Sequence, residues 1–333
     1  MVTLYKHQED ALQETADFTH VAFYHDMGLG KTFTGSEKML RLGGRVNLVI
    51  CQKSKVSDWV EHFCKERELG TSTFDLTTKS GFADFLRETS NDFAVGIVNY
   101  NLVFRRPELL KLEFDTIMLD ESSMIQNDRA KRTKAILKMK TDNVILLSGT
   151  PTGGKYENLY SQLKLLGWNI TKRQYYTEFI LTKNIDVGGF KITVVVGYIN
   201  IGRLKRRMRQ FGCHFLKTED VFDLPQQTFQ DISVPVSSKY KQFVKNKIVE
   251  IDGKELVGDT TLTQMLYQRQ LCGAYSAEKM AAFTDLLSST EDRLIVFYNF
   301  NDELNMLKYA CNEWNRPVSE VNGKKKGLTA YEN

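Results

Sequence analysis

The 333-residue chain has little proline or cysteine and no long hydrophobic run, and each shortage argues against a class of protein. Five prolines and no low-complexity tract argue against a long disordered linker. The five cysteines are scattered without a C-x-x-C pair, which argues against a disulfide framework and a zinc site. No apolar run approaches the roughly 20 residues that span a bilayer, and the N-terminus lacks a signal-peptide apolar region. We therefore expect a cytoplasmic protein with reduced thiols and no membrane partner.

The composition is that of a globular chain long enough for about two domains. Hydrophobic residues make up 42% of the sequence and charged residues 26%, within the usual range for globular proteins. The net charge of +4 is too small to indicate nucleic-acid binding by itself. The distribution of the positive charges is therefore more informative than their sum.

The first 167 residues alternate strand-like apolar runs with helix-like stretches. Strands are predicted at Val21–Tyr24, Val46–Cys51, Phe93–Val98, Phe114–Asp120 and Val144–Leu147. Several of these runs are almost continuously apolar, as in parallel strands that are covered on both faces. Helices are predicted at Thr34–Arg41, Ser57–Lys65, Arg129–Met139 and Glu157–Leu166. The alternation predicts a doubly wound α/β domain with its ligand chemistry at the carboxyl ends of the strands.

The pattern changes after residue 167. We expect a hairpin or short strands over residues 187–198, a basic helix over 201–210 and mostly helix over 237–290. Arg293–Phe297 then predicts a strand and Asp302–Glu313 a helix, which is how a second α/β domain would begin. The predicted organisation is a first lobe over 1–167, a helical and hairpin insertion with a linker over 168–290, and the beginning of a second lobe over 291–333.

The segment Asp26–Thr32 has the layout of a phosphate cradle, because it joins a predicted strand to a predicted helix through two glycines. Gly28 and Gly30 let backbone N–H groups close around phosphate oxygens, and the positive end of the following helix dipole favours the same anion. Lys31 would reach the β- and γ-phosphates, and the Thr32 hydroxyl would hold Mg²⁺. His25 stands where the usual motif has its first glycine. Taken alone, the segment is also compatible with an ordinary glycine-rich turn.

Two further polar segments follow predicted strands. Asp120 and Glu121 end the apolar run at 117–119, where the aspartate could hold Mg²⁺ and the glutamate could deprotonate an attacking water. Alone, this pair could equally be two solvated loop residues. Ser148-Gly149-Thr150-Pro151 follows the strand at 144–147, placed to contact the acidic pair, and by itself would be a plain turn.

The order of these motifs resembles that of superfamily 2 helicases and translocases of the Swi/Snf-like group, most like short phage or bacterial versions. The similarity covers nearly the whole chain. Leu4–Gln8 is similar to the adenine-reading motif, and motifs I, Ia, II, III and IV correspond to Asp26–Thr32, Leu48–Ser54 with Trp59, Asp120–Ser123, Ser148–Pro151 and Leu294–Phe300. The stretches similar to segments that flank these motifs are Val98–Tyr100, Phe215–Pro225 and Asn322–Lys324. Ser122-Ser123 departs from the commoner residues of motif II. Motifs V and VI, the latter supplying arginine fingers, have no counterpart, so we expect the chain to be part of a longer product.

The resemblance implies a RecA-like first lobe that binds ATP and Mg²⁺. It implies catalytic roles for Lys31, Asp120 and Glu121, and metal binding by Thr32 and Asp120. The implied ATP-binding residues are Tyr5, Gln8, Met27, Gly28, Leu29, Gly30, Lys31 and Thr32, with Gln8 reading adenine. Ser148, Gly149 and Thr150 would couple the nucleotide site to DNA.

Candidate DNA contacts lie in two places. Five cations fall within the seven residues Arg203–Arg209, opposite an apolar face formed by Leu204, Met208 and Phe211. They could contact phosphates without sequence preference or simply be a solvated helix surface. From this group we select Arg203, Arg206 and Arg207, and from the sheet edge Lys53, Ser54, Asn99 and Tyr100.

The favoured hypothesis is an ATP-dependent translocase or helicase that contacts the backbone of DNA, which we expect to be duplex DNA. The alternative is a nucleotide-regulated DNA-binding module with little or no hydrolysis, which the missing motifs favour for this chain. A P-loop kinase or small-molecule NTPase is disfavoured by the ordered set of motifs. Which protein partners the chain has is unknown from the sequence.

Overall fold

The computed structural model describes residues 3–66, 72–88, 93–323 and 326–327. Its contacts divide the chain into two compact units, Met1–Pro225 (unit 1) and Gln226–Asn333 (unit 2). Residues 168–225, which we expected to open an insertion, are part of unit 1. The three-part division at residues 167 and 290 remains a prediction about separate domains.

Unit 1 is built on a seven-stranded sheet in the order β3-β4-β2-β5-β6-β1-β9, and all of its neighbouring strands run parallel. The strands are β1 (His20–His25), β2 (Val46–Cys51), β3 (Thr73–Asp75), β4 (Ala94–Asn99), β5 (Glu113–Leu119), β6 (Lys140–Leu147) and β9 (Cys213–Leu216). The five strands predicted from apolar runs are all present, displaced by a residue or two at most ends. Two strands were not predicted, β3 and β9. Both are too short to form a recognisable apolar run.

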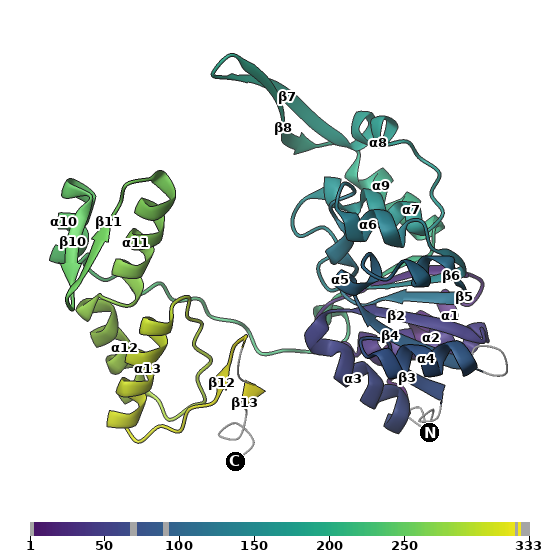
Figure 1. Cartoon of the computed structure of the whole chain (residues 1–333), viewed down its shortest axis with the longest axis horizontal. Coiled ribbons are helices and arrows are strands. Elements are labelled where there is room, and N and C mark those ends of the chain that lie inside the picture. Colours follow the sequence, from purple (N-terminus) through teal and green to yellow (C-terminus); the bar gives the residue numbers. More distant parts are fainter. Residues whose placement is uncertain (1–2, 67–71, 89–92, 324–325, 328–333) are drawn as a thin grey trace. The chain divides into compact units, whose positions relative to one another are not determined.

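Helices cover both faces of the sheet, as the doubly wound prediction requires (Figure 1). The helices of unit 1 are α1 (Lys6–Glu14), α2 (Lys31–Leu42), α3 (Val56–Glu61), α4 (Lys79–Glu88), α5 (Tyr100–Val103), α6 (Lys131–Ile136), α7 (Tyr160–Leu165), α8 (Lys172–Phe179) and α9 (Ile201–Gln210). Several short 3-10 turns flank them, namely η1 (Lys53–Lys55), η4 (Pro107–Lys111), η5 (Ser122–Ile125), η6 (Tyr156–Leu159) and η7 (Thr218–Asp220). The single helix predicted at Ser57–Lys65 is α3 followed by a π-helical turn, η2 (His62–Glu66).

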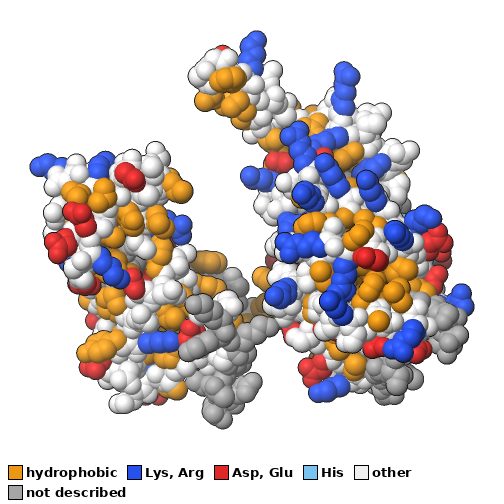
Figure 2. Space-filling view, viewed as in Figure 1, with side chains coloured by type: hydrophobic (Ala, Val, Ile, Leu, Met, Phe, Trp, Pro, Cys, Tyr) orange, Lys and Arg blue, Asp and Glu red, His pale blue; other side chains and the backbone are white. Residues whose placement is uncertain are grey.

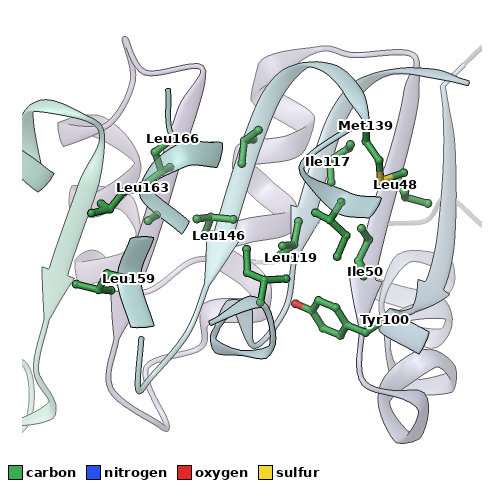
Figure 3. Packing of buried hydrophobic residues seen from close by; sticks show 14 of the residues in the cluster. Leu48, Ile50, Tyr100, Ile117, Leu119, Met139, Leu146, Leu159, Leu163 and Leu166 are labelled. Carbon is green, nitrogen blue, oxygen red and sulfur yellow. The ribbon is translucent and has the colours of Figure 1, made fainter. Parts of the chain in front are cut away.

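Successive strand residues are buried in two different cores. Leu48, Ile50, Ile117 and Leu119 belong to one cluster, which Figure 3 shows together with Leu163 of α7. Val49, Met118 and Leu147 belong to the other cluster, on the opposite side of the same strands. Because side chains alternate along a strand, burial of both sets requires helices on both faces. This two-sided burial explains why the strands could be predicted from continuous apolar runs.

A two-stranded hairpin extends from the body of unit 1 (Figure 1). It consists of β7 (Ile180–Val187) and β8 (Phe190–Tyr198), which pair antiparallel across a turn at Gly188 and Gly189. Both glycines have positive φ, at 60° and 83°, which explains their position in the turn. The hairpin prediction is confirmed, although β7 begins earlier than expected.

Unit 2 has a smaller core, formed by Phe243, Val249, Ile251 and Leu271. Its elements are α10 (Ser238–Asn246), β10 (Ile248–Ile251), β11 (Lys254–Val257), α11 (Thr261–Gly273), α12 (Ala277–Ser289), α13 (Asn301–Glu313), β12 (Glu320–Val321) and β13 (Lys326–Gly327). The β10–β11 hairpin interrupts a region predicted to be mostly helical. Lys324, assigned by resemblance to a further motif, lies outside the described residues.

The strand predicted at Arg293–Phe297 is absent, which corrects the sequence-based assignment. Ile295 and Phe297 of this segment are 82% and 91% exposed. An apolar run becomes a strand only when a neighbouring strand takes up its backbone hydrogen bonds, and the described strands of unit 2 pair only with one another, β10 with β11 and β12 with β13. In the described part of the chain, no helix has the length and apolar character needed to cross a membrane.

Candidate functional site

The loop between β1 and α2 forms a cradle at the carboxyl edge of the sheet. Gly28 and Gly30 have φ values of 85° and 67°, a region that other residues rarely adopt. A Cβ at Gly30 would lie 2.2 Å from Nε2 of Gln8, so this position also lacks room for a side chain. Helix α2 then begins at Lys31, and its first N–H groups have no partner within the helix. The loop can therefore present N–H groups and a positive helix end to an anion.

Lys31 lies inside this cradle. Its Nζ donates hydrogen bonds to the carbonyl oxygens of His25 and Asp26, both at 2.9 Å. Burial lowers the pKa of Lys31, while the nearby carboxylates of Glu121 and Asp120 act to raise it. The ammonium group is therefore placed where it can exchange its two carbonyl partners for phosphate oxygens.

The acidic pair follows β5, two strands away from the cradle in the sheet. Glu121 has φ 52° and ψ 59°, a left-handed conformation that costs roughly 1–3 kcal/mol for a non-glycine residue. Burial, and next the neighbouring Asp120, raise the pKa of Glu121. A half-buried glutamate held in an unfavourable backbone conformation indicates a position maintained for chemistry.

Two aromatic side chains hold the acidic turn. The indole Nε1 of Trp59 donates to Oδ2 of Asp120 at 2.9 Å. The hydroxyl of Tyr100 donates to the backbone carbonyls of Asp120 and Glu121, at 2.8 Å and 3.3 Å. Tyr100 is 2% exposed and packs near Ile50 and Leu119, as Figure 3 shows. Its side chain cannot reach a DNA strand from this position, which corrects its assignment as a DNA contact.

The Ser148–Pro151 segment lies against the cradle, because β6 and β1 are neighbours in the sheet. Oγ of Ser148 accepts a hydrogen bond from the N–H of Thr150 at 3.1 Å. A Cβ added at Gly149 would lie 3.5 Å from Nζ of Lys31. The segment predicted to couple the site therefore lies beside the ammonium group of Lys31.

Gln162 of α7 was not predicted, and it connects three of these segments. Its Oε1 accepts hydrogen bonds from Oγ of Ser122 at 2.8 Å and from the hydroxyl of Tyr24 at 3.1 Å. Its Nε2 donates to the carbonyl of Pro151 at 2.9 Å. Ser122, the departure from the usual motif II, thus reaches the Ser148–Pro151 segment through one fully buried amide. A glutamine among the apolar positions of this helix was the only sequence signal for it.

The opposite end of the cradle is bordered by α1. Gln8 donates from Nε2 to the carbonyls of Leu29 and Gly30 at 3.4 Å and 3.2 Å, and its Oε1 accepts the Tyr5 N–H at 2.9 Å. The Tyr5 ring is 69% exposed and stacks on His7, with ring centroids 5.8 Å apart. Tyr5 therefore offers a flat aromatic face beside the cradle, suited to a planar base.

His25, which replaces the first glycine of the usual motif, is fully buried. Its Nε2 lies 2.8 Å from Nδ1 of His214 in β9, and Nε2 of His214 lies 3.3 Å from a carboxylate oxygen of Glu14. Burial, followed by the charges of His214, Lys31 and His7, lowers the pKa of His25 to about 3. The histidine is thus a neutral packing element that joins β1 to β9, and it carries no charge near the cradle.

The chemistry of the site fits a Mg²⁺ ion shared with phosphates. The Thr32 hydroxyl and the Asp120 carboxylate offer the oxygen ligands that Mg²⁺ prefers. Among the described residues, no group of three or more His, Cys, Asp or Glu side chains could hold a metal alone. A cation at this position would therefore depend on ligands from a bound nucleotide and water, as Mg²⁺ usually does in phosphate sites.

On the face of unit 1 that Figure 2 shows, basic side chains gather over the part that carries α6, α8 and α9 in Figure 1. In α9, Leu204 and Met208 are buried and the five cations are exposed, as the helical pattern predicts. Arg203 is 3.5 Å from Glu178, and Arg207 lies over the Trp168 ring at 5.9 Å. Among the described residues, Arg206 has neither an ion-pair partner nor an aromatic ring beneath its guanidinium.

The other proposed contacts lie at the carboxyl ends of two strands. Lys53 and Ser54 are exposed in η1, directly after β2. Asn99 ends β4, and its side chain accepts the Leu102 N–H at 3.1 Å as the cap of α5. These residues therefore lie on the same edge of the sheet as the cradle, which is the placement expected for them.

Known proteins are similar to this chain in sequence. The family model for the SNF2-related domain matches residues 17–277. TATA-binding protein-associated factor BTAF1 of Arabidopsis thaliana is 27% identical over 70% of this chain and 13% of its own length. The putative ATP-dependent helicase/translocase YwqA of Bacillus subtilis is 24% identical over 90% of this chain and 35% of its own length. The chain thus spans about a third or less of these relatives.

A solved structure agrees with the fold. The Sulfolobus solfataricus SWI2/SNF2 ATPase core in complex with dsDNA is 19% identical, with a TM-score of 0.51. The match covers 97% of this chain and 74% of that one. The fold is therefore the RecA-like α/β fold expected from the resemblance, and the chain belongs to the SNF2-related domain family.

Proposed function

We propose that the chain is the ATP-binding part of a DNA translocase that hydrolyses ATP to move along or remodel DNA. The observation that carries the proposal is the convergence of the Lys31 cradle, the acidic pair and the Ser148–Thr150 segment at one edge of the sheet. These segments are up to 120 residues apart in sequence, and a phosphate, a metal and an attacking water would each find their partner there.

Each residue has a distinct role in this proposal. Lys31 and the N–H groups around Gly28 and Gly30 bind the β- and γ-phosphates, and Thr32 with Asp120 holds Mg²⁺, which neutralises phosphate charge when it is bound. Glu121 accepts a proton from the attacking water. Gln8, Tyr5, Met27 and Leu29 border the nucleotide, with the Gln8 amide and the Tyr5 ring on the adenine side.

DNA contact is proposed at the exposed basic surface, through backbone phosphates and without sequence preference. Lys53, Ser54 and Asn99 would follow the strand along the sheet edge, and Arg203, Arg206 and Arg207 would add charge from α9. The Sulfolobus relative, which was solved with duplex DNA, supports duplex as the substrate. The basic side chains on the face of unit 1 shown in Figure 2 support contact with backbone phosphates.

The test is ATP hydrolysis by the chain, and by a version extended with the remainder of a second lobe, with no DNA, single-stranded DNA or duplex DNA. Lys31→Ala should weaken ATP binding by about 100-fold, because it removes a charge-assisted partner of the phosphates. Lys254→Ala in unit 2 is the matched control. DNA-stimulated turnover that depends on Lys31 supports the proposal. Unchanged ATP affinity in Lys31→Ala would overturn the cradle assignment, and binding without turnover in either version would leave a nucleotide-regulated DNA-binding module.

A further inference from the structure

Trp59 makes a polar contact that packing alone does not require. Its side chain is 3% exposed, and its indole N–H points at Oδ2 of Asp120, 2.9 Å away. The ring lies edge-on to His62 and stacks with Phe63, with centroids 5.6 Å and 5.8 Å away. The indole therefore packs against two aromatic rings while its N–H is directed at the carboxylate.

The contact lies at the end of a short, continuous connection to the molecular surface. Helix α3, which carries Trp59, begins directly after η1, whose residues Lys53–Lys55 have exposed side chains. Only four residues separate Ser54 from Trp59. A force on the backbone at η1 therefore reaches the indole through less than two helical turns.

The acidic turn has a second connection of the same kind. Tyr100 follows Asn99, which is half-buried at the sheet edge, and the Tyr100 hydroxyl holds the backbone of Asp120 and Glu121. One aromatic side chain thus orients the carboxylate, and the other orients the backbone. Each comes from a segment that begins with a proposed DNA contact.

We propose that Trp59 is a positioning residue that orients the Asp120 carboxylate for Mg²⁺ and makes metal binding respond to DNA contact at Lys53–Lys55. The proposal rests on the function proposed above. With Oδ2 held by the indole, Oδ1 is the carboxylate oxygen that would be left to bind Mg²⁺. No Lys or Arg among the described residues is within ion-pair distance of Asp120, so no other side chain competes for this role. Groups that orient a metal ligand typically change metal affinity or activity by 10–100-fold when they are removed.

The test compares Trp59→Phe with Trp314→Phe, which removes an indole from unit 2. Binding of a fluorescent ATP analogue is titrated with Mg²⁺, with and without duplex DNA. In Trp59→Phe we expect the half-saturating Mg²⁺ concentration to rise about 10-fold and its shift on DNA addition to disappear. Trp314→Phe should behave as wild type in both respects.

Tryptophan fluorescence gives a readout that does not depend on turnover. In a chain with Trp168→Phe and Trp314→Phe, Trp59 alone emits, and its spectrum should change when Mg²⁺ is added with the ATP analogue. If Trp59→Phe fails to fold, 3-benzothienylalanine at position 59 keeps the two-ring shape and removes only the N–H.

The outcomes separate the two proposals. Wild-type Mg²⁺ dependence in the benzothienyl or phenylalanine variant would overturn the role of Trp59 and leave the proposed function intact. A raised Mg²⁺ requirement with a retained DNA shift would overturn the coupling and keep the positioning role. Absence of Mg²⁺-dependent nucleotide binding in the wild-type chain would overturn the proposed function itself.

Discussion

Units 1 and 2 each contain an apolar run with the composition of a buried strand, yet only one of the two becomes a strand. Leu48–Cys51 is completely buried in β2, with neighbours on both sides. Leu294–Phe297 has no strand partner among the described residues, and its side chains are between 37% and 91% exposed. The comparison shows that the residues of a run determine its capacity to be a strand, while its neighbours determine whether that capacity is used.

The same contrast appears in two glutamates. Glu303 of unit 2 is 5% exposed, and although burial alone would raise its pKa, bonds from the Asn299 N–H and from Lys279 lower it. The pKa of Glu121 is raised because burial and the charge of Asp120 outweigh the opposing charge of Lys31. Glu303 therefore serves the structure of unit 2, whereas Glu121 keeps its carboxylate available for chemistry.

The largest expected effect would sharpen the contrast between the glutamates. Glu121→Gln should retain ATP binding and lower hydrolysis by about 10²–10⁴-fold, because it removes the proposed general base. Glu303→Gln should leave hydrolysis per folded molecule within a few-fold. Both are measured as steady-state turnover together with nucleotide binding. Persistent hydrolysis in Glu121→Gln would mean that another group takes the proton.

A second test asks whether the buried apolar residues of unit 1 and the exposed apolar segment 294–297 of unit 2 differ in their contribution to stability. Leu119→Ala should lower the free energy of unfolding of unit 1 by about 2–5 kcal/mol, because it opens a cavity in the larger core. Phe297→Ser should change the stability of unit 2 by less than about 0.5 kcal/mol, because its ring is 91% exposed. Amide hydrogen exchange, measured separately for the residues of each unit, gives both changes in stability. Strong destabilisation by Phe297→Ser would show that the segment is buried in solution.

Lowering the pH should reduce the stability of unit 1 more than that of unit 2, because all five histidines lie in unit 1. The folded pKa of His25 is about 3, below the ordinary value of 6.5, so the unfolded chain takes up a proton between these pH values that the folded chain does not. The stability of unit 1 should therefore fall as pH drops below 6.5, by about 2 kcal/mol at pH 5. His214, whose pKa burial also lowers, acts in the same direction.

The measurement is hydrogen exchange at pH 7 and pH 5, corrected for the intrinsic rate of exchange. Unit 2 should change little over this range. His25→Gln should flatten the pH dependence of unit 1, since an amide does not titrate. An equal loss of stability in both units, or the same slope in the variant, would contradict the assignment of this effect to His25.

The smallest effect concerns the surface charges. Neutralising Arg206 and Arg207 should lower the salt dependence of DNA affinity by about one unit of slope for each arginine that binds a phosphate. Arg207 also stacks on Trp168, so Arg206 is the cleaner single variant. Lys241→Ala in α10 of unit 2 is the control. An unchanged slope in the double variant would make α9 a solvated helix surface.

Much of unit 1 could be predicted because its signals are local. The Gly28 and Gly30 loop, the apolar run of β5 and the acidic pair behind it each indicate their structure within about ten residues. Adjacent parallel strands then bring their carboxyl ends together as a rule of the fold. The hairpin β10–β11 and the strand β9 escaped prediction because short strands depend on partners rather than on their own residues.

The sequence by itself determined the alternation of the central strands and helices of unit 1 and the residues proposed to bind phosphate and metal, because these follow from local patterns. Tertiary structure alone decided how they are held. It placed Trp59 on Asp120, Gln162 between Ser122 and Pro151, and His214 on His25, and it buried Tyr100 away from the surface. Each contact joins residues that are at least 11 and up to 189 positions apart. Such pairings depend on the packing of whole elements, which no local pattern specifies.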